Sequence, residues 1–270
     1  QKAADAAGVK LTVADAGDDA AKQTSDIEDL VASGISVLIV NPVDSDAVTG
    51  AVEFAKSKGV KVIAVDRAVN GTEIECQIAS DNVLGAELAT QFIVDQLGEG
   101  TVVAELEGVP GASAAIDRSK GFHNIADDKL EVVAKQTANF DRTQGMSVME
   151  NMLQANGNIQ GVFAANDEMA LGAVEAIAGA GKDIVVVGFD ATDDALESIK
   201  AGKMAATIAA NAPIAVRACK KAINEGLDVD MDEALVIEEK LFGSCFKTAD
   251  QIEGMSAFLE KRKHEPYQNK

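Results

Sequence analysis

The chain has 270 residues, of which 47% are hydrophobic and 25% are charged, a composition typical of a folded globular protein. Its formal net charge of −20 disfavours nucleic acid as a partner, because an acidic surface repels a phosphate backbone. Three dispersed cysteines and two histidines argue against a zinc site, so we expect no metal and no cofactor, and no apolar run reaches the about 18 residues of a membrane span.

Short β-branched segments alternate with amphipathic segments over the first two hundred residues. The apolar segments predict strands at 9–15, 35–40, 60–65, 101–107, 130–136, 159–165 and 183–189. They carry few polar residues, which predicts burial on both faces. Helices are predicted at 18–34 and at 44–59, the second beginning at a capping Asp44. The alternation predicts an α/β fold with parallel sheets, wound as βαβ units.

Polar side chains directly follow four of the predicted strands. They are Asn41, Asp66 with Arg67, Asn166 and Asp190. Ligands of open parallel sheets bind beyond the carboxyl ends of the strands, where these residues are expected to lie. Carboxylates, amides and a guanidinium together can bind the hydroxyl groups of a neutral polyol, each of which donates and accepts. The alternative is that each residue only caps the next helix, or that Asn41 and Pro42 form a plain turn.

Motifs for enzymatic chemistry are missing from the sequence. The segment GVPGAS (108–113) is rich in glycine but matches neither a P-loop nor a dinucleotide-binding fingerprint. No serine lies in a GxSxG elbow. The acidic residues along the helices are interpreted as solvated faces. The residues therefore favour a binding protein over an enzyme.

Several segments, in a fixed order, resemble the bacterial ribose-binding proteins, a group of type I periplasmic binding proteins that serve sugar ABC transporters. They are VNPVDSDAV (40–48), VDRAVNG (65–71), IASDNVLG (78–85), GASAAIDRSKGF (111–122), ANFDRTQGMSVMENML (138–153), FAANDEMALGA (163–173) and VVGFDATDD (186–194). The resemblance implies two Rossmann-like lobes, at 1–80 and 81–207, that close about a hinge on a monosaccharide. It also implies an ABC transporter permease as partner and a periplasmic or extracellular location.

The resemblance assigns ligand-binding roles to individual positions. Asp66 and Arg67 would bind sugar hydroxyls from the first lobe, and Arg118, Asn166 and Asp190 from the second. Phe140 would lie against the apolar face of the sugar ring. Asn41 and Phe189 also match ligand-binding positions of the family. Without the resemblance, Phe140 reads as core packing and Arg118 as a surface cation.

Two departures from the family pattern are expected to affect the site. Family members begin with a strand and a loop that carries an Asn and paired Phe residues, whereas this chain begins inside the following helix. The first lobe is therefore expected to lack a strand and half of an aromatic sandwich. In addition, Ala210 stands where the family has a Gln.

The strand–helix alternation stops after about residue 207. Helical periodicity predicts three helices, at 212–227, 230–246 and 248–263, and so an all-helical segment at 208–270. Residues 208–263 resemble the C-terminal helices of crotonase-family enoyl-CoA hydratases, which makes the chain an apparent composite. No residue matches that family's catalytic glutamates. The basic EKRK (260–263) reads either as a contact to a CoA phosphate or as a solvated helix end.

Two other functions have weaker support in the sequence. A CoA-thioester hydratase needs paired carboxylates and an oxyanion hole, which the sequence does not supply. A sugar-sensing repressor core of the same fold needs a basic helix-turn-helix segment before residue 1. We therefore expect a non-enzymatic sugar-binding protein.

Overall fold

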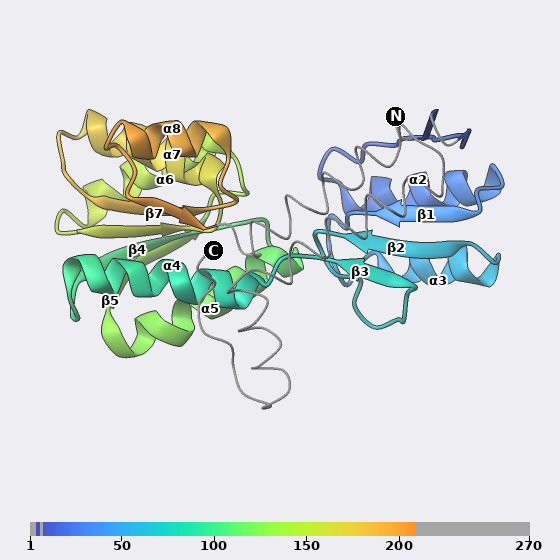
Figure 1. Ribbon diagram of the computed structural model, residues 1–270, viewed down its shortest axis with the longest axis horizontal. Helices are drawn as coiled ribbons and strands as arrows, with labels where there is room; N and C mark the ends of the chain where they lie inside the picture. Colours follow the sequence, from blue (N-terminus) through green and yellow to red (C-terminus); the bar gives the residue numbers. More distant parts are fainter. Residues whose placement is uncertain (1–3, 6–7, 209–270) are drawn as a thin grey trace, which may run out of the picture. The chain divides into compact units, whose positions relative to one another are not determined.

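The computed structural model describes residues 4–5 and 8–208, and its helices and strands from residue 20 onward belong to one compact unit, Ala14–Ala210. They form two parallel α/β arrangements, so the predicted fold class is confirmed (Figure 1). The predicted helical segment, the crotonase-like resemblance and the Ala210 departure fall outside the described residues, apart from Ile208. The lobe boundary at residue 80 stays a prediction.

The first sheet has the strand order β1-β2-β3, and α2 and α3 pack on one of its faces. Leu38 and Val62 point toward these helices and join Ile27 and Val52 in a buried cluster. The elements are α2 (Ala20–Ala32), β1 (Val37–Val40), α3 (Thr49–Ser57), β2 (Lys61–Val65) and β3 (Cys76–Ile78).

The second sheet has the strand order β5-β4-β6-β7-β8, with all neighbours parallel. Figure 1 shows α6, α7 and α8 on one face of this sheet and α4 and α5 on the other. Chain order reverses at β4, whose neighbours are β5 and β6, so the carboxyl end of β4 is a topological switch point. The elements are α4 (Asn82–Leu97), β4 (Val102–Glu107), α5 (Ser113–Lys129), β5 (Glu131–Thr137), α6 (Arg142–Ala155), β6 (Gly161–Ala164), α7 (Asp167–Gly179), β7 (Val185–Phe189), α8 (Asp193–Lys200) and β8 (Ala206–Ile208).

Helices α6 and α7 approach closely because each contributes a glycine to the contact. A Cβ at Gly145 would collide with the backbone of Met169, and a Cβ at Gly172 would collide with the carbonyl oxygen of Arg142. The close approach places the N-terminus of α7 beside the loop that precedes α6. Both segments contribute residues to the candidate site.

Three predictions about the fold are wrong. Residues 9–15 form no strand, and Val9, Leu11 and Val13 are exposed. The helix predicted from Asp44 begins at Thr49, because Asp44 Oδ1 accepts from the backbone N–H groups of residues 46 and 47 and stabilises a turn instead.

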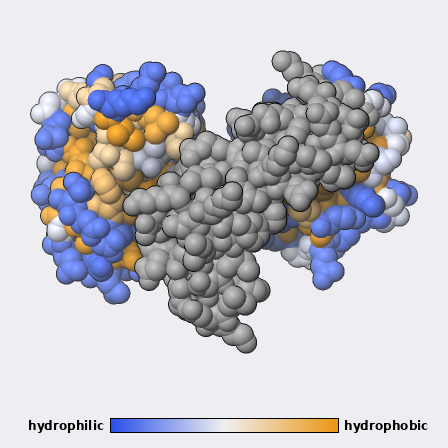
Figure 2. All heavy atoms as spheres, in the orientation of Figure 1, coloured by the Kyte–Doolittle hydropathy of each residue, from blue (hydrophilic) through white to orange (hydrophobic). Residues whose placement is uncertain are grey.

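The third wrong prediction is burial on both faces, which holds at all positions only for β6. Strand β1 alternates, with Val37 and Ile39 exposed, because α2 and α3 cover only its other face. Strand β5 lies at an edge of the second sheet and is only partly buried. Figure 2 shows hydrophilic residues over α8, and hydrophobic residues beside it toward the sheet.

Candidate functional site

Strands β2 and β7 are each followed by the same kind of turn, which we call a corner: an aspartate with positive φ whose backbone N–H donates to a neighbouring strand. Asp66 directly follows β2 and Asp190 directly follows β7, with φ of 68° and 114°. The backbone N–H of Asp66 donates to Ile78 O at 2.8 Å, and that of Asp190 donates to Ile208 O at 3.0 Å. Both acceptors are the last residues of short neighbouring strands, β3 and β8. Left-handed backbone at non-glycine residues is costly and tends to cluster at functional sites.

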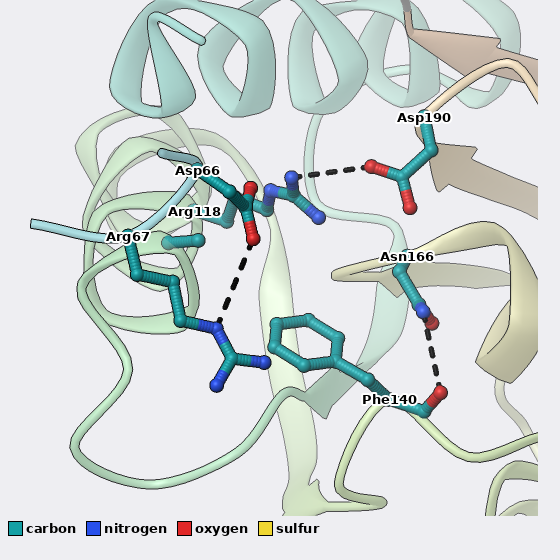
Figure 3. Close-up of a pocket in the computed structure, with 7 residues that line it drawn as sticks. Asp66, Arg67, Arg118, Phe140, Asn166 and Asp190 are labelled. Atoms are coloured by element: carbon teal, nitrogen blue, oxygen red, sulfur yellow. Dashed lines mark hydrogen bonds and ion pairs between the residues drawn. The ribbon is translucent and has the colours of Figure 1, made fainter. Parts of the chain in front are cut away.

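The two corners open on a pocket of about 200 Å³, shown in Figure 3. A pocket of this volume suits a small polar ligand. The pocket lies near the switch point of the second sheet. It is lined by Asp66, Arg67, Ala114, Arg118, Phe140, Asn166 and Asp190.

The structure thus brings six of the eight predicted site residues to one pocket. Asn41 and Phe189 are not among the lining residues, but both contact residues that are. Asn41 Nδ2 donates to Asp66 Oδ2 at 3.2 Å. Phe189 is 1% exposed, and the centroid of its ring lies 3.8 Å from the guanidinium carbon of Arg118.

Arg118 is the most deeply held charged group of the pocket. It belongs to α5, and its side chain is only 6% exposed. Nε donates to Asn82 Oδ1 at 2.9 Å, Nη1 donates to Ala165 O at 2.6 Å, and Nη2 lies 3.2 Å from Asp190 Oδ1. Burial lowers the pKa of Arg118, while the charge of Asp190 opposes that shift. Arg118 is therefore buried. The reading as a surface cation, which the sequence favours when the family resemblance is set aside, is wrong.

Phe140 contributes the apolar surface of the pocket. Its backbone has φ of 59°, and its ring lies so close to Gly108 that a Cβ there would collide with it. The guanidinium carbons of Arg67 and Arg118 lie 5.7 and 5.8 Å from the ring centroid (Figure 3). These distances permit cation–π attraction to both. The ring is therefore partly a pocket wall, and does not serve core packing alone.

Arg67 has a buried donor, Nε, with no hydrogen-bond partner among the described residues. Its Nη1 donates to Pro42 O and Val43 O, both at 3.2 Å. Its buried Nε has no hydrogen-bond partner in that part of the chain, and Asp66 Oδ2 lies 3.9 Å from it. Buried donors are normally paired, so an unpaired one beside a pocket points to a ligand acceptor.

Only one of the four strand-end positions serves as a helix cap. Asn166 Oδ1 accepts from Met169 N at 2.9 Å at the start of α7, while its Nδ2 donates to Phe140 O at 3.3 Å. The next helix after Asp190 is capped by Thr192. Capping therefore does not account for the other strand-end residues.

The ionisable groups of the pocket balance in sign. Asp66 and Asp190 face Arg67 and Arg118, two carboxylates against two guanidinium groups. Burial raises the pKa of Asp190 to about 6, and the positive charge of Arg118 opposes that rise. At neutral pH the carboxylate is mainly ionised, so the lining is close to neutral overall.

Segments that follow strands of the two sheets also contact each other beside the pocket. Ser113 Oγ accepts from Ala68 N at 2.7 Å, and Ser113 N donates to Ser45 Oγ at 3.2 Å. Ser45 N donates to Gly111 O at 3.0 Å, and Ser45 is 1% exposed. These bonds hold the start of α5, and so Arg118, near the Asp66 corner.

The sequence reasoning missed Ala114, a pocket-lining residue near the start of α5. It also missed Asn82, which holds Arg118. No sequence signal identifies either one, because a small residue and a helix-start Asn are common. Among residues 4–5 and 8–208, no helix is long and apolar enough to cross a membrane, and no group of His, Cys, Asp or Glu is arranged to hold a metal ion.

The parallel α/β fold, with a charge-balanced pocket at the carboxyl ends of its strands, defines a solute-binding protein of the type I periplasmic class. The sequence profile of the periplasmic binding protein domain matches residues 1–227, and the chain belongs to this family.

Known relatives agree with this assignment. The ribose import binding protein RbsB of Bacillus subtilis (strain 168) is 56% identical over 209 residues, covering 77% of this chain and 68% of that protein. RbsB of Escherichia coli (strain K12) is 47% identical over 211 residues, covering 77% and 71%. The crystal structure of the Caulobacter myo-inositol binding protein, bound to myo-inositol, superposes with a TM-score of 0.71 at 36% identity, covering 75% of this chain and 73% of that one.

Proposed function

We propose that this protein binds a neutral monosaccharide, D-ribose or a close relative, and presents it to an ABC transporter permease. The observation that carries the proposal is the charge balance of the pocket beside the flat face of Phe140. Such a lining suits the hydroxyl groups of an uncharged polyol and disfavours a ligand with net charge. The ribose-binding relatives and the myo-inositol complex support this ligand class.

Each pocket residue has a role that follows from its chemistry. Asp66 and Arg67 bind hydroxyls from the first-sheet side, and Arg118, Asn166 and Asp190 bind them from the second-sheet side. Phe140 lies against the apolar face of the sugar ring. Asn41 and Phe189 support the pocket from behind, through Asp66 and Arg118 respectively.

A thermal melt with and without millimolar D-ribose, followed by circular dichroism, tests the proposal. A ligand at 100 times its Kd adds about 2.7 kcal/mol to the free energy of unfolding, so the Tm rises by several degrees. D-ribose 5-phosphate is the charged control, and we expect no shift with it. The Arg142→Met variant, changed outside the pocket, keeps the ribose shift. An unchanged Tm with D-ribose, or an equal shift with the phosphate, contradicts the proposal.

A periplasmic location accompanies this function. The matched family is that of periplasmic binding proteins, which supports a place outside the cytoplasmic membrane, where a permease can receive the sugar. The relatives are import binding proteins and not enzymes, in agreement with the prediction of a non-enzymatic chain.

We further propose that the segment predicted as a helical tail, 208–270, is foreign to this function. The proposal rests on the resemblance of residues 208–263 to enoyl-CoA hydratases. The match to the periplasmic binding protein domain extends to residue 227, so it includes residues 208–227 and leaves only 228–270 outside. Because no residue matches the hydratase glutamates, the full chain is expected to hydrate crotonyl-CoA no faster than buffer. Measurable turnover would instead favour the hydratase alternative.

A further inference from the structure

Asp167 is a fully buried carboxylate that does not line the pocket. It begins α7, directly after the pocket residue Asn166, and is 0% exposed. Oδ1 accepts from Thr207 Oγ1 at 2.6 Å, and Oδ2 accepts from Thr192 N at 2.8 Å. A buried charge is costly unless it is hydrogen-bonded, and these bonds to a carboxylate are of the stronger kind. The position therefore has a specific structural role.

Of the two partners of Asp167, Thr192 belongs to the corner that carries Asp190, and Thr207 lies in the neighbouring strand β8. Asp190 and Ala191 have φ of 114° and 57°, so two successive non-glycine residues adopt left-handed backbone. Their N–H groups donate to Ile208 O at 3.0 Å and to Thr207 Oγ1 at 3.1 Å. With the bond from Thr192 N to Asp167, three consecutive backbone donors of the corner are held. Two of these three bonds depend on Asp167 or Thr207, and we call this pair of side chains the clamp.

The corner that carries Asp66 is held in a different way. Asp66 N donates to Ile78 O at 2.8 Å, as Asp190 N does to Ile208 O. The next donor, Arg67 N, bonds to Val65 O at 2.8 Å, and the third, Ala68 N, bonds to the hydroxyl of Ser113 at 2.7 Å. Within residues 8–208, no buried carboxylate accepts from the N–H groups of this corner. The clamp is therefore an addition to a shared corner geometry, and it acts on the carboxylate that pairs with Arg118.

We propose that Asp167 and Thr207 are positioning residues that hold Asp190 in its ligand-facing conformation. The inference rests on the proposed function, since it assigns Asp190 to ligand binding. Thr207 hydrogen-bonds both Asp167 and the Ala191 N–H, so the hydroxyl connects the buried carboxylate to the corner. Neither residue needs to touch the ligand.

Because Asp167 is charged, replacing it should also change the pKa of Asp190, which can be measured separately from any loss of structure. The charged groups that face Asp190 are Arg118 from α5, Asp66 from the end of β2, and Asp167 from α7. Asp167 and Asp66 raise the pKa of Asp190, whereas Arg118 lowers it. An Asp167→Asn change therefore lowers the pKa of Asp190 while keeping the side-chain volume.

The test is calorimetric titration of the full chain with D-ribose between pH 5 and pH 8. We expect Thr207→Val to raise Kd about tenfold, and Thr207→Ser, which keeps the hydroxyl, to restore most of the affinity. Thr90→Val is the matched control, because Thr90 is a fully buried threonine in α4 whose hydroxyl donates to Ala86 O, away from the pocket. In Asp167→Asn, the pH below which affinity falls moves lower than in the wild type. Thr207→Val with a Kd equal to that of Thr90→Val would overturn the proposal.

A second readout separates this proposal from the proposed function. The carboxyl carbon of Asp190 is titrated by NMR without ligand in the wild type and in Asp167→Asn. The loss of charge alone lowers the midpoint in Asp167→Asn, so the same titration of Thr207→Val, which removes no charge, decides the positioning role. A shifted midpoint or shifted Asp190 signals in Thr207→Val support the role even if D-ribose binds to neither protein, in which case only the ligand assignment fails. An unchanged midpoint with unchanged Asp190 signals overturns the positioning role.

Discussion

The two sheets are built from similar apolar segments and differ in what covers them. Strand β1 exposes Val37 and Ile39 at 46% and 63%, whereas β6 is buried at every position. Helices lie on both faces of the second sheet, while α2 and α3 lie on one face of the first (Figure 1). An apolar strand sequence therefore favours burial, but whether both faces of the strand are covered depends on helices that are distant in the sequence.

The pocket shows a similar difference: its residues on the second-sheet side are more buried than those on the first-sheet side. The ion pair of Asp66 and Arg67 spans 3.9 Å, and their side chains are 48% and 14% exposed. The pair of Asp190 and Arg118 spans 3.2 Å, and their side chains are 39% and 6% exposed. Arg118 also makes hydrogen bonds of 2.9 and 2.6 Å, whereas the two made by Arg67 are both 3.2 Å long. The contacts on the second-sheet side are thus shorter and more buried.

Replacing the two pocket arginines tests this difference with the largest expected effect. Arg118→Met leaves Asp190 and two buried acceptors without their cation, so we expect a loss of about 3–5 kcal/mol in the free energy of unfolding. Arg67→Met removes two bonds to backbone carbonyls and is expected to cost about 1 kcal/mol. Urea denaturation without ligand measures both values. Equal losses would remove the distinction between the two sides.

A pair of glycine substitutions compares the packing around the two sheets. Gly172→Ala forces a Cβ against the Arg142 carbonyl in the α6–α7 contact, with an expected cost of about 3 kcal/mol. Gly50→Ala in α3 meets no atom within 4 Å and is expected to stabilise by about 0.5–1 kcal/mol. The two Tm shifts should have opposite signs. A stabilising Gly172→Ala would show that α6 and α7 are not closely packed.

Two glutamates should give opposite dependences of stability on pH. Burial raises the pKa of Glu105 in β4, whereas the hydrogen bond from Val62 N, 2.7 Å long, lowers the pKa of Glu75 beside the first sheet. The wild type therefore loses stability from Glu105 as the pH rises above 4.5, and loses stability from Glu75 as the pH falls below 4.5.

Matched glutamine variants isolate each contribution. Relative to the wild type, Glu105→Gln should gain stability as the pH rises, and Glu75→Gln should lose it. Urea denaturation between about pH 2.5 and pH 8 measures both differences, since the Glu75 contribution changes below pH 4.5 and the Glu105 contribution above it. Slopes of the same sign for the two variants would contradict the assignment of opposite pKa shifts.

The smallest expected effect comes from removing a single methyl group. Ile93→Val in α4 trims a side chain that is 0% exposed and should cost about 1 kcal/mol. Ile39→Val in β1 trims a side chain that is 63% exposed and should change stability by less than about 0.5 kcal/mol. Comparable losses would mean that Ile39 is buried in solution by something that covers the first sheet.

Much of the fold was accessible from sequence because strand and helix periodicities differ. Each predicted strand is present except 9–15, whose apolar residues find no neighbouring strand among the described residues. The short strands β3 and β8 could not be predicted, since three residues carry no usable periodicity. They exist because β2 and β7 offer free backbone groups at their edges.

The site was accessible only in part. The position after a strand identifies Asp66, Arg67 and Asp190 without knowledge of any family. Arg118 and Phe140 required the family resemblance, because a charged residue in an amphipathic helix ordinarily faces solvent. Asp167 and Thr207 could not be found at all, because their roles arise from contacts between segments about 40 residues apart, which no local pattern records.

The corner shared by Asp66 and Asp190 has a consequence for the origin and redesign of such pockets. Each corner consists of a strand end, a left-handed aspartate and a backbone bond to a short neighbouring strand, so the pocket combines two half-sites of one design. That repetition is what duplication of an ancestral half would leave behind. Because the clamp holds only one of the two corners, the two half-sites can be altered separately, through residues that do not line the pocket.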